Sequence, residues 1–534
     1  MLSRFPSSVR FLLAILLLSL VWPAIDFSFL VFIAYVPILL QMRSMQQKGL
    51  PTRRFAWWVF SLQLIWSLIN TYWISYATWL GPVASSLVYA GIFTIPFVLS
   101  YKLATAKGNP NNKYGLLLLV LCWISIDYLQ LHWDLYWPWF HLGNSFANYP
   151  SWVQWYEYTG VFGGTLWVWL VNIVVYKLWI SWDHATSLNQ KIWTILRKGI
   201  VYILIPISIS FLVASKYEIK GETYKVGIYQ PNYFIEDKYY NIPFSRQLET
   251  FQTSIDSTAH LGLDLLVCPE TFIPPPLMEE STIKENYLIQ RIQRFLPDSN
   301  VALLTGLNSY RTFTKEELDN PGPTAMAYRG KLIERYNAAL LMSSDSLSSI
   351  YHKSKLVAGV EMVPFENFLV PLLGNLSLDF GGHVGSLGRA KYPEILSYKK
   401  AKIAPIICFE SIFGDYVSSF VADGANLICI ITNDSWWGDT AGYRQHLAYA
   451  RLRAIENRRY IVRSANTGIS AVIDPYGDIK VLSNWDERAF LSAEVELLTE
   501  ITFFVKYKHA IARLSIFVLI LILLHLFVQS KRLV

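Results

Sequence analysis

The sequence predicts a bundle of about eight transmembrane helices joined to one large α/β sandwich domain. Hydrophobic residues make up 53% of the chain and charged residues only 16%, whereas an ordinary soluble domain carries about 25% charged residues. Long apolar runs fill most of residues 9–215. Between residues 222 and 508, short runs rich in Val and Ile alternate with helical stretches, which is the pattern of an α/β sandwich.

Eight apolar runs are candidate membrane spans, because a helix needs roughly 20 residues to cross a bilayer. Seven lie in the first 215 residues and the eighth lies near the C-terminus: 9–23, 26–42, 56–78, 82–104, 114–133, 161–181, 199–215 and 509–528. The first two are short and are separated at Trp22-Pro23, which favours a tight helical hairpin. A cleavable signal peptide is the alternative for the first run, but apolar runs continue directly after it.

The loops between these runs differ in charge, and the difference predicts an orientation. Basic residues lie at the N-terminus, in the loops after the second, fourth and sixth runs, and in the C-terminal tail. Arg53 and Arg54, for example, lie in the loop after the second run. The alternate loops, near 24–25, 79–81 and 134–160, contain no Lys or Arg. The positive-inside rule therefore places both termini in the cytoplasm and the sandwich domain outside it. We expect three parts: helices in 1–215, the domain in 216–508, and a last helix with its tail in 509–534.

The loop 134–160 is rich in aromatic residues, among them Trp139, Phe140 and Trp155. Trp and Tyr without basic neighbours are typical of the outer membrane–water boundary. The simple interpretation is an anchoring belt. The functional interpretation is a wall that guides lipid chains toward the outer domain.

In the outer domain, apolar runs predict strands and one amphipathic stretch predicts a helix. Leu248, Phe251 and Ile255 recur at helical spacing. A second helix is predicted over 445–459, which holds good helix formers. A turn at Pro475-Tyr476-Gly477-Asp478 predicts a hairpin. The predicted strands are 224–229, 263–268, 301–304, 337–342, 403–407, 427–431, 469–474 and 479–482.

Three chemically reactive residues follow predicted strands: Glu270, Lys353 and Cys408. Each has a plainer interpretation by itself, as a surface carboxylate, a surface lysine or a packed thiol. Together they form a coherent set, because a carboxylate takes a thiol proton and a lysine ammonium stabilises both a thiolate and an oxyanion. The backbone N–H of Phe409 is a candidate second oxyanion donor.

These residues lie in motifs that resemble a known family. Pro269-Glu270-Thr271, Lys353 and Cys408-Phe409-Glu410 are similar to the Glu–Lys–Cys triad of the nitrilase/carbon–nitrogen hydrolase superfamily. The whole chain resembles the bacterial apolipoprotein N-acyltransferases, which have about eight membrane segments around an outward-facing nitrilase-like αββα domain. Further matching stretches are 154–163, 336–340, 351–357, 432–439, 445–448, 453–456 and 465–470.

The resemblance implies a role for several positions of this chain. The general base falls on Glu270, the oxyanion lysine on Lys353 and the nucleophile on Cys408. Supporting or substrate-contacting positions fall on Glu361, Phe409, Glu410 and Tyr239. The chain departs from the family pattern at Ala358-Gly359-Val360, where Pro-Phe-Gly is usual, and this leaves the geometry of the lid loop open.

The implied activity is acyl transfer from a membrane phospholipid, through a Cys408 thioester, to the α-amine of the diacylglyceryl-cysteine of a lipoprotein. The implied location is the inner membrane, with the domain on the periplasmic side. A membrane-anchored amidase that uses water, or a scaffold without activity, are the alternatives. Eight spans argue against the first and the complete triad argues against the second.

The remaining composition predicts no metal, cofactor or nucleic-acid partner. The four cysteines form neither a CxxC pair nor a zinc-like spacing with histidine. Cys122, Cys268 and Cys429 are therefore expected to be packed thiols. The net charge of +7 comes in good part from the loops between apolar runs, so it does not point to nucleic acid.

Overall fold

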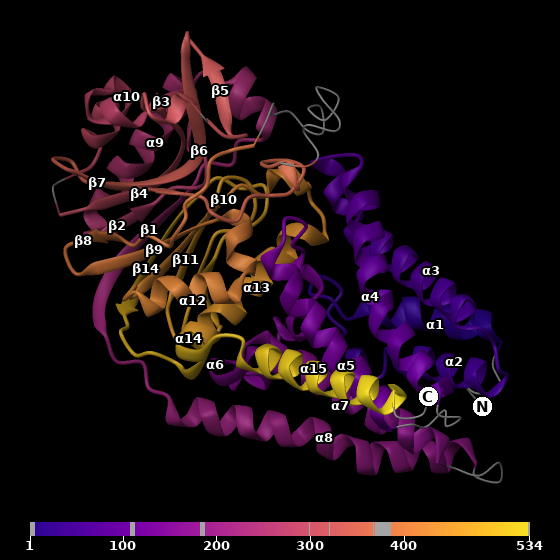
Figure 1. The fold of residues 1–534 in the computed structure, drawn as a ribbon. Coiled ribbons are helices and arrows are strands. Elements are labelled where there is room, and N and C mark those ends of the chain that lie inside the picture. The colour runs from indigo at the N-terminus through magenta and orange to yellow at the C-terminus, as the bar shows by residue number, and fades with distance from the viewer. Residues whose placement is uncertain are drawn as a thin grey trace. The chain divides into compact units, whose positions relative to one another are not determined.

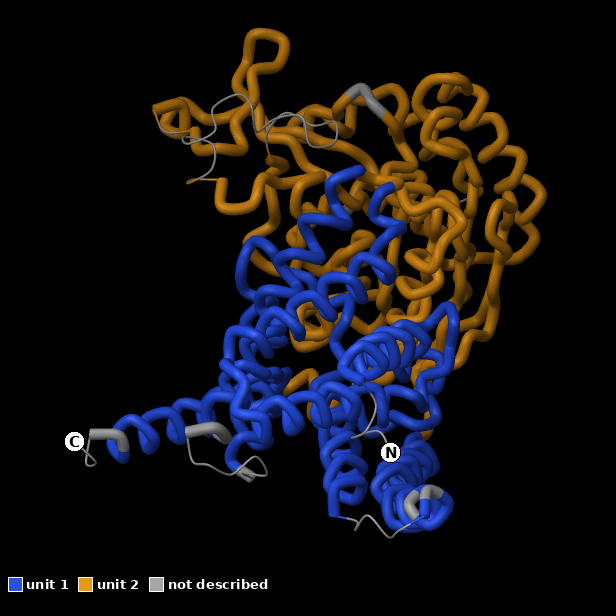
Figure 2. Tube along the Cα trace, turned by 90° about the vertical axis from the view of Figure 1, so that its right-hand side faces the viewer, with its two compact units in different colours: residues 1–75, 79–217, 507–534 blue, residues 76–78, 218–506 orange. Residues whose placement is uncertain are grey.

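The computed structural model describes residues 6–106, 113–181, 187–297, 300–319, 321–366, 368 and 386–531. The chain forms two compact units, shown in Figure 2. Unit 1 comprises Met1–Ser75, Trp79–Tyr217 and Tyr507–Val534, and unit 2 comprises Tyr76–Thr78 and Glu218–Lys506.

Unit 1 is helical, and a helix lies at each of the eight positions where the sequence predicts a span. These helices are α1 (Ser7–Leu20), α2 (Val36–Gln47), α3 (Thr52–Thr71), α4 (Gly81–Ala106), α5 (Lys113–Leu129), α7 (Val161–Ile180), α8 (Leu188–Lys216) and α15 (Ala510–Lys531). The helix α8 begins earlier than predicted, at a capping box in which Ser187 and Gln190 bond each other's backbone N–H groups. The C-terminal helix α15 packs against α5 (Figure 1).

Six helical stretches of the described residues are long and apolar enough to cross a bilayer. They are Ser28–Gln47, Gly81–Leu103, Tyr114–His132, Val161–Ile180, Ile192–Lys216 and Ala510–Gln529. The helix α1 is shorter, at 14 residues. The protein is thus a membrane protein, and the prediction of eight spans stays a prediction.

Aromatic residues fill the interior of unit 1. Trp139 and Phe140 are buried, and their rings contact those of Trp73, Trp22 and Trp66. The interpretation of this stretch as an interfacial belt or lipid-guiding wall is wrong for these two residues. The loop folds into short 3-10 turns that carry them inward, and a sequence pattern of aromatic residues does not distinguish a core from an interface.

Unit 2 contains two β-sheets (Figure 1). The first has eight strands in the order β14-β1-β2-β4-β6-β5, with β3 beside β4 and β7 beside β6. Its strands are β1 (Glu222–Gln230), β2 (Leu265–Val267), β3 (Ile273–Glu279), β4 (Ala302–Thr312), β5 (Ala325–Tyr328), β6 (Lys331–Met342), β7 (Leu347–His352) and β14 (Ala489–Leu497). The strands β1, β2 and β4 run parallel to one another.

The second sheet has six strands in the order β13-β12-β11-β10-β9-β8. Its strands are β8 (Leu396–Tyr398), β9 (Ala401–Ile407), β10 (Leu427–Thr432), β11 (Ile461–Ala465), β12 (Ala471–Ile473) and β13 (Ile479–Leu482). The central strands β9, β10 and β11 run parallel. The predicted hairpin is formed by β12 and β13, which pair antiparallel.

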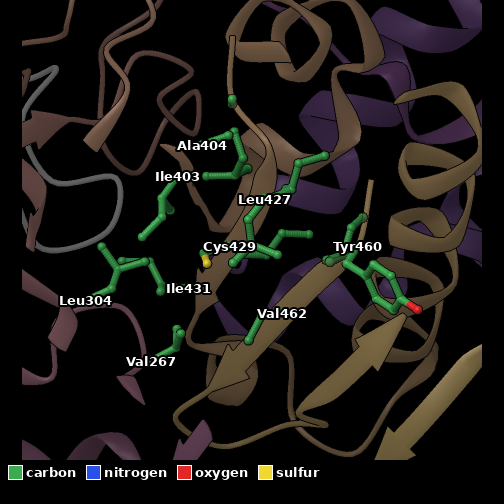
Figure 3. Packing of buried hydrophobic residues seen from close by; sticks show 14 of the residues in the cluster. Val267, Leu304, Ile403, Ala404, Leu427, Cys429, Ile431, Tyr460 and Val462 are labelled. Carbon is green, nitrogen blue, oxygen red and sulfur yellow. The ribbon is translucent and has the colours of Figure 1, made fainter. Parts of the chain in front are cut away.

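The two sheets pack face to face, and helices cover their outer faces. Val267 and Leu304 of the first sheet lie opposite Ile403 and Ile431 of the second (Figure 3). The helices α9 (Phe244–Thr258) and α10 (Tyr287–Gln293) contribute to the core on the far side of the first sheet. The helices α12 (Gly414–Ala422) and α13 (Ala441–Asn457) cover the second sheet. The predicted αββα sandwich is confirmed, and the thiol of Cys429 is packed inside it, as expected.

Candidate active site

Unit 2 contains a cavity of about 850 Å³, and Glu270, Lys353 and Cys408 all line it. Glu270 comes three residues after β2, Lys353 directly follows β7, and Cys408 directly follows β9. Their exposed fractions are 5%, 1% and 6%. The three residues that the sequence singles out therefore meet in one buried place, although 138 positions separate the first from the last.

Lys353 joins two carboxylates in this cavity. Its Nζ lies 3.3 Å from Oε1 of Glu270 and 2.9 Å from Oε1 of Glu361. Burial lowers the pKa of Lys353, but the two carboxylates raise it by more, so its pKa lies well above the usual value. Lys353 is thus an ammonium ion at neutral pH.

Backbone and amide donors hold the Glu270 carboxylate. Nδ2 of Asn337 donates to Oε1 of Glu270 at 2.8 Å and to Oε1 of Glu361 at 3.0 Å. The backbone N–H of Asn433 donates to Oε2 of Glu270 at 3.1 Å. Asn337 and Asn433 lie in stretches that resemble the family, but their contacts with Glu270 become visible only in the fold.

Cys408 stands at the sharp turn where β9 ends and a 3-10 turn, Cys408–Ile412, begins. Its φ of +51° lies in the left-handed region, which a residue with a side chain rarely adopts. Burial raises the pKa of the Cys408 thiol and the nearby Glu270 carboxylate raises it further, while Lys353 lowers it in part. Cys408 therefore stays a thiol at neutral pH, and it becomes a nucleophile only if a base takes its proton.

The carboxylate of Glu410 accepts hydrogen bonds from the backbone and does not face the cavity. Its Oε2 accepts from the N–H of Ile407 at 2.8 Å, and its Oε1 accepts from the N–H of Ser354 at 2.6 Å and from the hydroxyl of Tyr351 at 2.7 Å. Burial raises the pKa of Glu410 to about 7, against these hydrogen bonds, which lower it. Glu410 thus ties the turn of Cys408 to the segment that follows Lys353. It is not among the described residues that line the cavity.

Tyr239 lines the cavity, and its neighbour Lys238 is a site residue that sequence reasoning missed. Nζ of Lys238 donates to the carbonyl of Glu270 at 3.2 Å and to Oγ1 of Thr271 at 3.0 Å. The hydroxyl of Tyr239 lies 3.2 Å from the same Oγ1. Thr271 has a φ of +48°, so the two side chains hold a left-handed residue beside Glu270. Burial lowers the pKa of Lys238 to about 7.

Two families of sequences match this chain. The sequence model of the carbon-nitrogen hydrolase family matches residues 225–501, just over half of the chain. The model of the apolipoprotein N-acyltransferase N-terminal domain matches residues 14–174. The chain belongs to the apolipoprotein N-acyltransferase family. It is therefore an acyltransferase with a domain of the carbon-nitrogen hydrolase superfamily.

Named relatives resemble the chain over most of its length. The apolipoprotein N-acyltransferase of Chlorobaculum tepidum is 29% identical over 501 residues, which cover 90% of this chain and 89% of the relative. That of Geobacter metallireducens is 26% identical over 94% of this chain and 92% of the relative. Among solved structures, an amidase of the nitrilase superfamily from Nesterenkonia covers 55% of this chain and 98% of its own, with 17% identity and a TM-score of 0.36.

The loop that departs from the family pattern still brings Glu361 to Lys353. The N–H groups of Val360 and Glu361 bond the carbonyl of Val357, and Gly359 takes a φ of +78° that favours glycine. Oε2 of Glu361 then accepts from the N–H of Val357 at 2.8 Å, while its Oε1 meets Lys353. The tight turn at Gly359 thus positions Glu361 in the loop whose geometry the sequence left open.

The site thus combines a thiol, a carboxylate held by fixed donors and a buried ammonium ion. Aromatic and aliphatic side chains form another part of the wall, among them Phe244, Val360, Trp436 and Trp437. Such a lining combines an apolar surface with a polar reacting group, and apolar walls limit the access of water.

Proposed function

We propose that the protein transfers an acyl chain from a membrane phospholipid, through a thioester on Cys408, to the α-amine of an N-terminal diacylglyceryl-cysteine of a lipoprotein. The observation that carries this proposal is the meeting of Cys408, Glu270 and Lys353 in one buried cavity. The names of the relatives support the acceptor, and the apolar helices of unit 1 support a lipid donor.

In the first step, Glu270 takes the proton of the Cys408 thiol and the sulfur attacks the ester carbonyl of the phospholipid. Negative charge develops on the carbonyl oxygen, and the Lys353 ammonium ion and the backbone N–H of Phe409 stabilise it. The carbon–oxygen bond of the ester then breaks. The departing oxygen of the lysophospholipid takes the proton from Glu270, which leaves an acyl-thioester on Cys408.

In the second step, the neutral amine of the acceptor attacks the thioester carbonyl. Glu270 takes one proton from the attacking nitrogen, and the same two donors stabilise the oxyanion. The carbon–sulfur bond breaks, an amide forms, and the sulfur recovers its proton from Glu270. One base serves both steps, because each step moves one proton between the entering and the leaving atom.

The raised pKa of Cys408 fits this role of Glu270. A thiol that ionised by itself would need no base, but burial keeps this one protonated. The Lys353 ammonium ion lies against Glu270 and Glu361, so its positive charge is fixed in place before the reaction begins.

The test uses the full-length protein in detergent and adds the two substrates in sequence. Phospholipid alone should give an acyl adduct on Cys408, seen by intact mass and by peptide mapping. A diacylglyceryl-cysteine peptide added later should remove the adduct and appear as its amide. Rapid release of free fatty acid before the peptide arrives would instead show an amidase-type hydrolase.

A matched pair of variants separates the nucleophile from the other buried thiols. Cys408→Ala should carry no adduct, whereas Cys429→Ala, at a thiol packed between the sheets, should be acylated normally. An adduct that persists in Cys408→Ala would overturn the assignment of the nucleophile.

The same proposal places the protein in the inner membrane with both termini in the cytoplasm and residues 216–508 on the periplasmic side. The charge difference between the loops supports it. A reporter that works only outside the cytoplasm should be active when fused after Lys220 and silent when fused after Arg54. The reverse pattern would refute this orientation.

A further inference from the structure

A second cluster of reactive side chains lies directly behind Cys408. Nε2 of His446 is 2.8 Å from Oγ of Ser411, and Nδ1 of His446 is 3.2 Å from Oδ1 of Asp434. This is the Ser–His–Asp order of contacts that hydrolases use to activate a serine. Here the exposed fractions of the three residues are 1%, 0% and 0%, and none of them lines the cavity. Ser411 therefore does not meet a substrate.

The cluster acts instead on the carbonyl of Cys408. Oγ of Ser411 lies 2.8 Å from this oxygen and Nε2 of His446 lies 3.1 Å from it. A carbonyl oxygen only accepts hydrogen bonds, so the Ser411 hydroxyl donates to it. Oγ of Ser411 must then accept from His446, which places a hydrogen on Nε2. The Ser411 hydroxyl thus donates to the carbonyl of Cys408, and the single hydrogen on Nε2 of His446 is shared between that carbonyl and Oγ of Ser411.

Arg463, which is paired with Asp434, holds the other edge of the His446 ring. The guanidinium of Arg463 lies 2.7 Å from Oδ2 of Asp434 and 3.1 Å from Nδ1 of His446. Burial raises the pKa of Asp434, but Arg463 and His446 lower it by more, so Asp434 is ionised. With the hydrogen on Nε2, Nδ1 accepts from Arg463, and Arg463 in turn is paired with Asp434. The ring is therefore held at both nitrogens beside the carbonyl of Cys408.

The carbonyl of Cys408 and the N–H of Phe409 belong to one planar peptide group, and in a trans peptide they point in opposite directions. A donor that fixes the carbonyl therefore also fixes the direction of the N–H. Hydrogen bonds to the carbonyl further polarise the group and make its N–H a stronger donor. This control matters here, because Cys408 has a left-handed backbone conformation that a residue with a side chain rarely adopts, so surrounding contacts must hold it.

We propose that His446, together with Ser411, is a positioning residue for acyl transfer: it holds the Cys408–Phe409 peptide so that the Phe409 N–H meets the oxyanion of the reacting ester. The inference rests on the proposed function, because the thioester chemistry generates that oxyanion. It assigns His446 no contact with the substrate and no proton transfer.

Two reactions of the same sulfur test it. Acylation by phospholipid passes through an oxyanion, whereas alkylation by iodoacetamide displaces iodide and forms none. Both require the Cys408 thiolate. In full-length protein, His446→Phe keeps the ring but removes both nitrogens. It should slow acylation roughly 10²-fold, the loss that follows removal of one oxyanion donor, and change the alkylation rate less than about 3-fold. His446→Gln restores an N–H donor and should recover part of the acylation rate.

Ser411→Ala provides a second, milder variant and should slow acylation about 10-fold with alkylation unchanged. Its matched control is Ser418→Ala, at an equally buried serine in α12, which should leave both rates unchanged. Thermal unfolding identifies any variant that does not fold. If His446→Phe does not fold, the acylation and alkylation rates of Ser411→Ala test the proposal.

The inference is overturned if a folded variant acylates at the normal rate, or if acylation and alkylation slow by the same factor. The second result would assign the cluster to general stability or to thiol ionisation. Failure of the proposed function is a separate outcome, because the unmodified protein itself would then show no acyl adduct on Cys408.

Discussion

Two of the buried charged clusters in unit 2 differ in charge balance and in their access to the cavity. In the first, Glu270 and Glu361 share the single cation Lys353, and all three line the cavity. In the second, Asp434 pairs with the cation Arg463 beside His446, and none of these three residues lines the cavity. The first cluster has one carboxylate more than its cations, so it has capacity to accept a proton. The second is balanced, so it holds its geometry.

The two clusters are suited to different roles: the first to proton transfer, and the second to holding side chains in place. A carboxylate in excess of its cations, beside a thiol, is suited to receive the thiol proton. A carboxylate paired with an arginine keeps its negative charge, and the pair holds a neighbouring ring in place. Cys408 lies between the two clusters: its side chain faces the first, and its carbonyl contacts the second.

The largest expected effect comes from removing the charge of the proposed base. Glu270→Gln keeps the size of the side chain and an acceptor for Asn337, but the amide cannot take the thiol proton. Acylation of Cys408 by phospholipid should fall about 10²–10⁴-fold, measured as adduct mass against time. Near-normal acylation of this variant would mean that Glu270 is not the base.

The second prediction concerns the balanced cluster and its stability. Asp434→Asn leaves the buried Arg463 charge without its carboxylate, which should lower the free energy of unfolding by about 3–5 kcal/mol. The control is Asp439→Asn, at an exposed Asp–Arg pair with Arg444, where the expected loss is below about 1 kcal/mol. Thermal or denaturant unfolding measures both. Equal losses would contradict the view that burial makes the pair indispensable.

The third prediction separates the two carboxylates of the first cluster. Glu361→Gln removes one negative charge beside Lys353 but keeps the carboxyl group of Glu270, so acylation should slow by ~10-fold, through a less firmly held oxyanion donor. The expected order of acylation rates is unmodified protein, then Glu361→Gln, then Glu270→Gln. A larger loss in Glu361→Gln than in Glu270→Gln would exchange the two assigned roles.

The sequence predicted the apolar parts of the fold best. Strands such as β10, which reads Leu-Ile-Cys-Ile-Ile-Thr and is buried throughout, have an apolar run that only a core strand explains. The strand β14, with alternating exposed and partly buried residues, gave no such signal, yet it pairs with β1 over nine residues. The strand β3 was hidden by three consecutive prolines. Such segments become strands because a neighbouring strand pairs with them, and their local composition does not predict this.

The candidate site was predictable where reactive residues directly follow a strand, as Cys408 does. Lys238 carried no such signal, because it lies in the polar stretch Glu236-Asp237-Lys238 and only a π-helical turn over Asp237–Asn241 buries it. The Asp434–His446 contact was equally invisible, since a histidine inside a helix predicts nothing about what packs behind it. Burial of a polar side chain is a property of the tertiary structure.

The smallest expected effect tests Lys238, the buried lysine whose Nζ donates to the carbonyl of Glu270. Its pKa is about 7 in the folded protein, below the usual 10.5, because burial disfavours the ammonium form. Between these two values the unfolded chain binds more protons than the folded one, so the contribution of Lys238 to stability rises with pH. Above about pH 10.5 the penalty is gone, and below about pH 7 it is fully present.

Lys238→Met removes this titration and keeps the aliphatic stem. The unfolding midpoint of the variant, relative to that of the unmodified protein, should therefore fall by ~3 °C between pH 7.5 and 8.5, since one unit of proton linkage corresponds to about 1.4 kcal/mol. The hydrogen bonds of Lys238 to Glu270 and Thr271 are lost at both pH values and so do not alter the slope. The buried cysteines, whose pKa values are raised, titrate in both proteins and cancel in the difference. A difference in midpoints that stays constant with pH would show that Lys238 is charged in the fold, like Lys353, and would make the two lysines of the cavity alike.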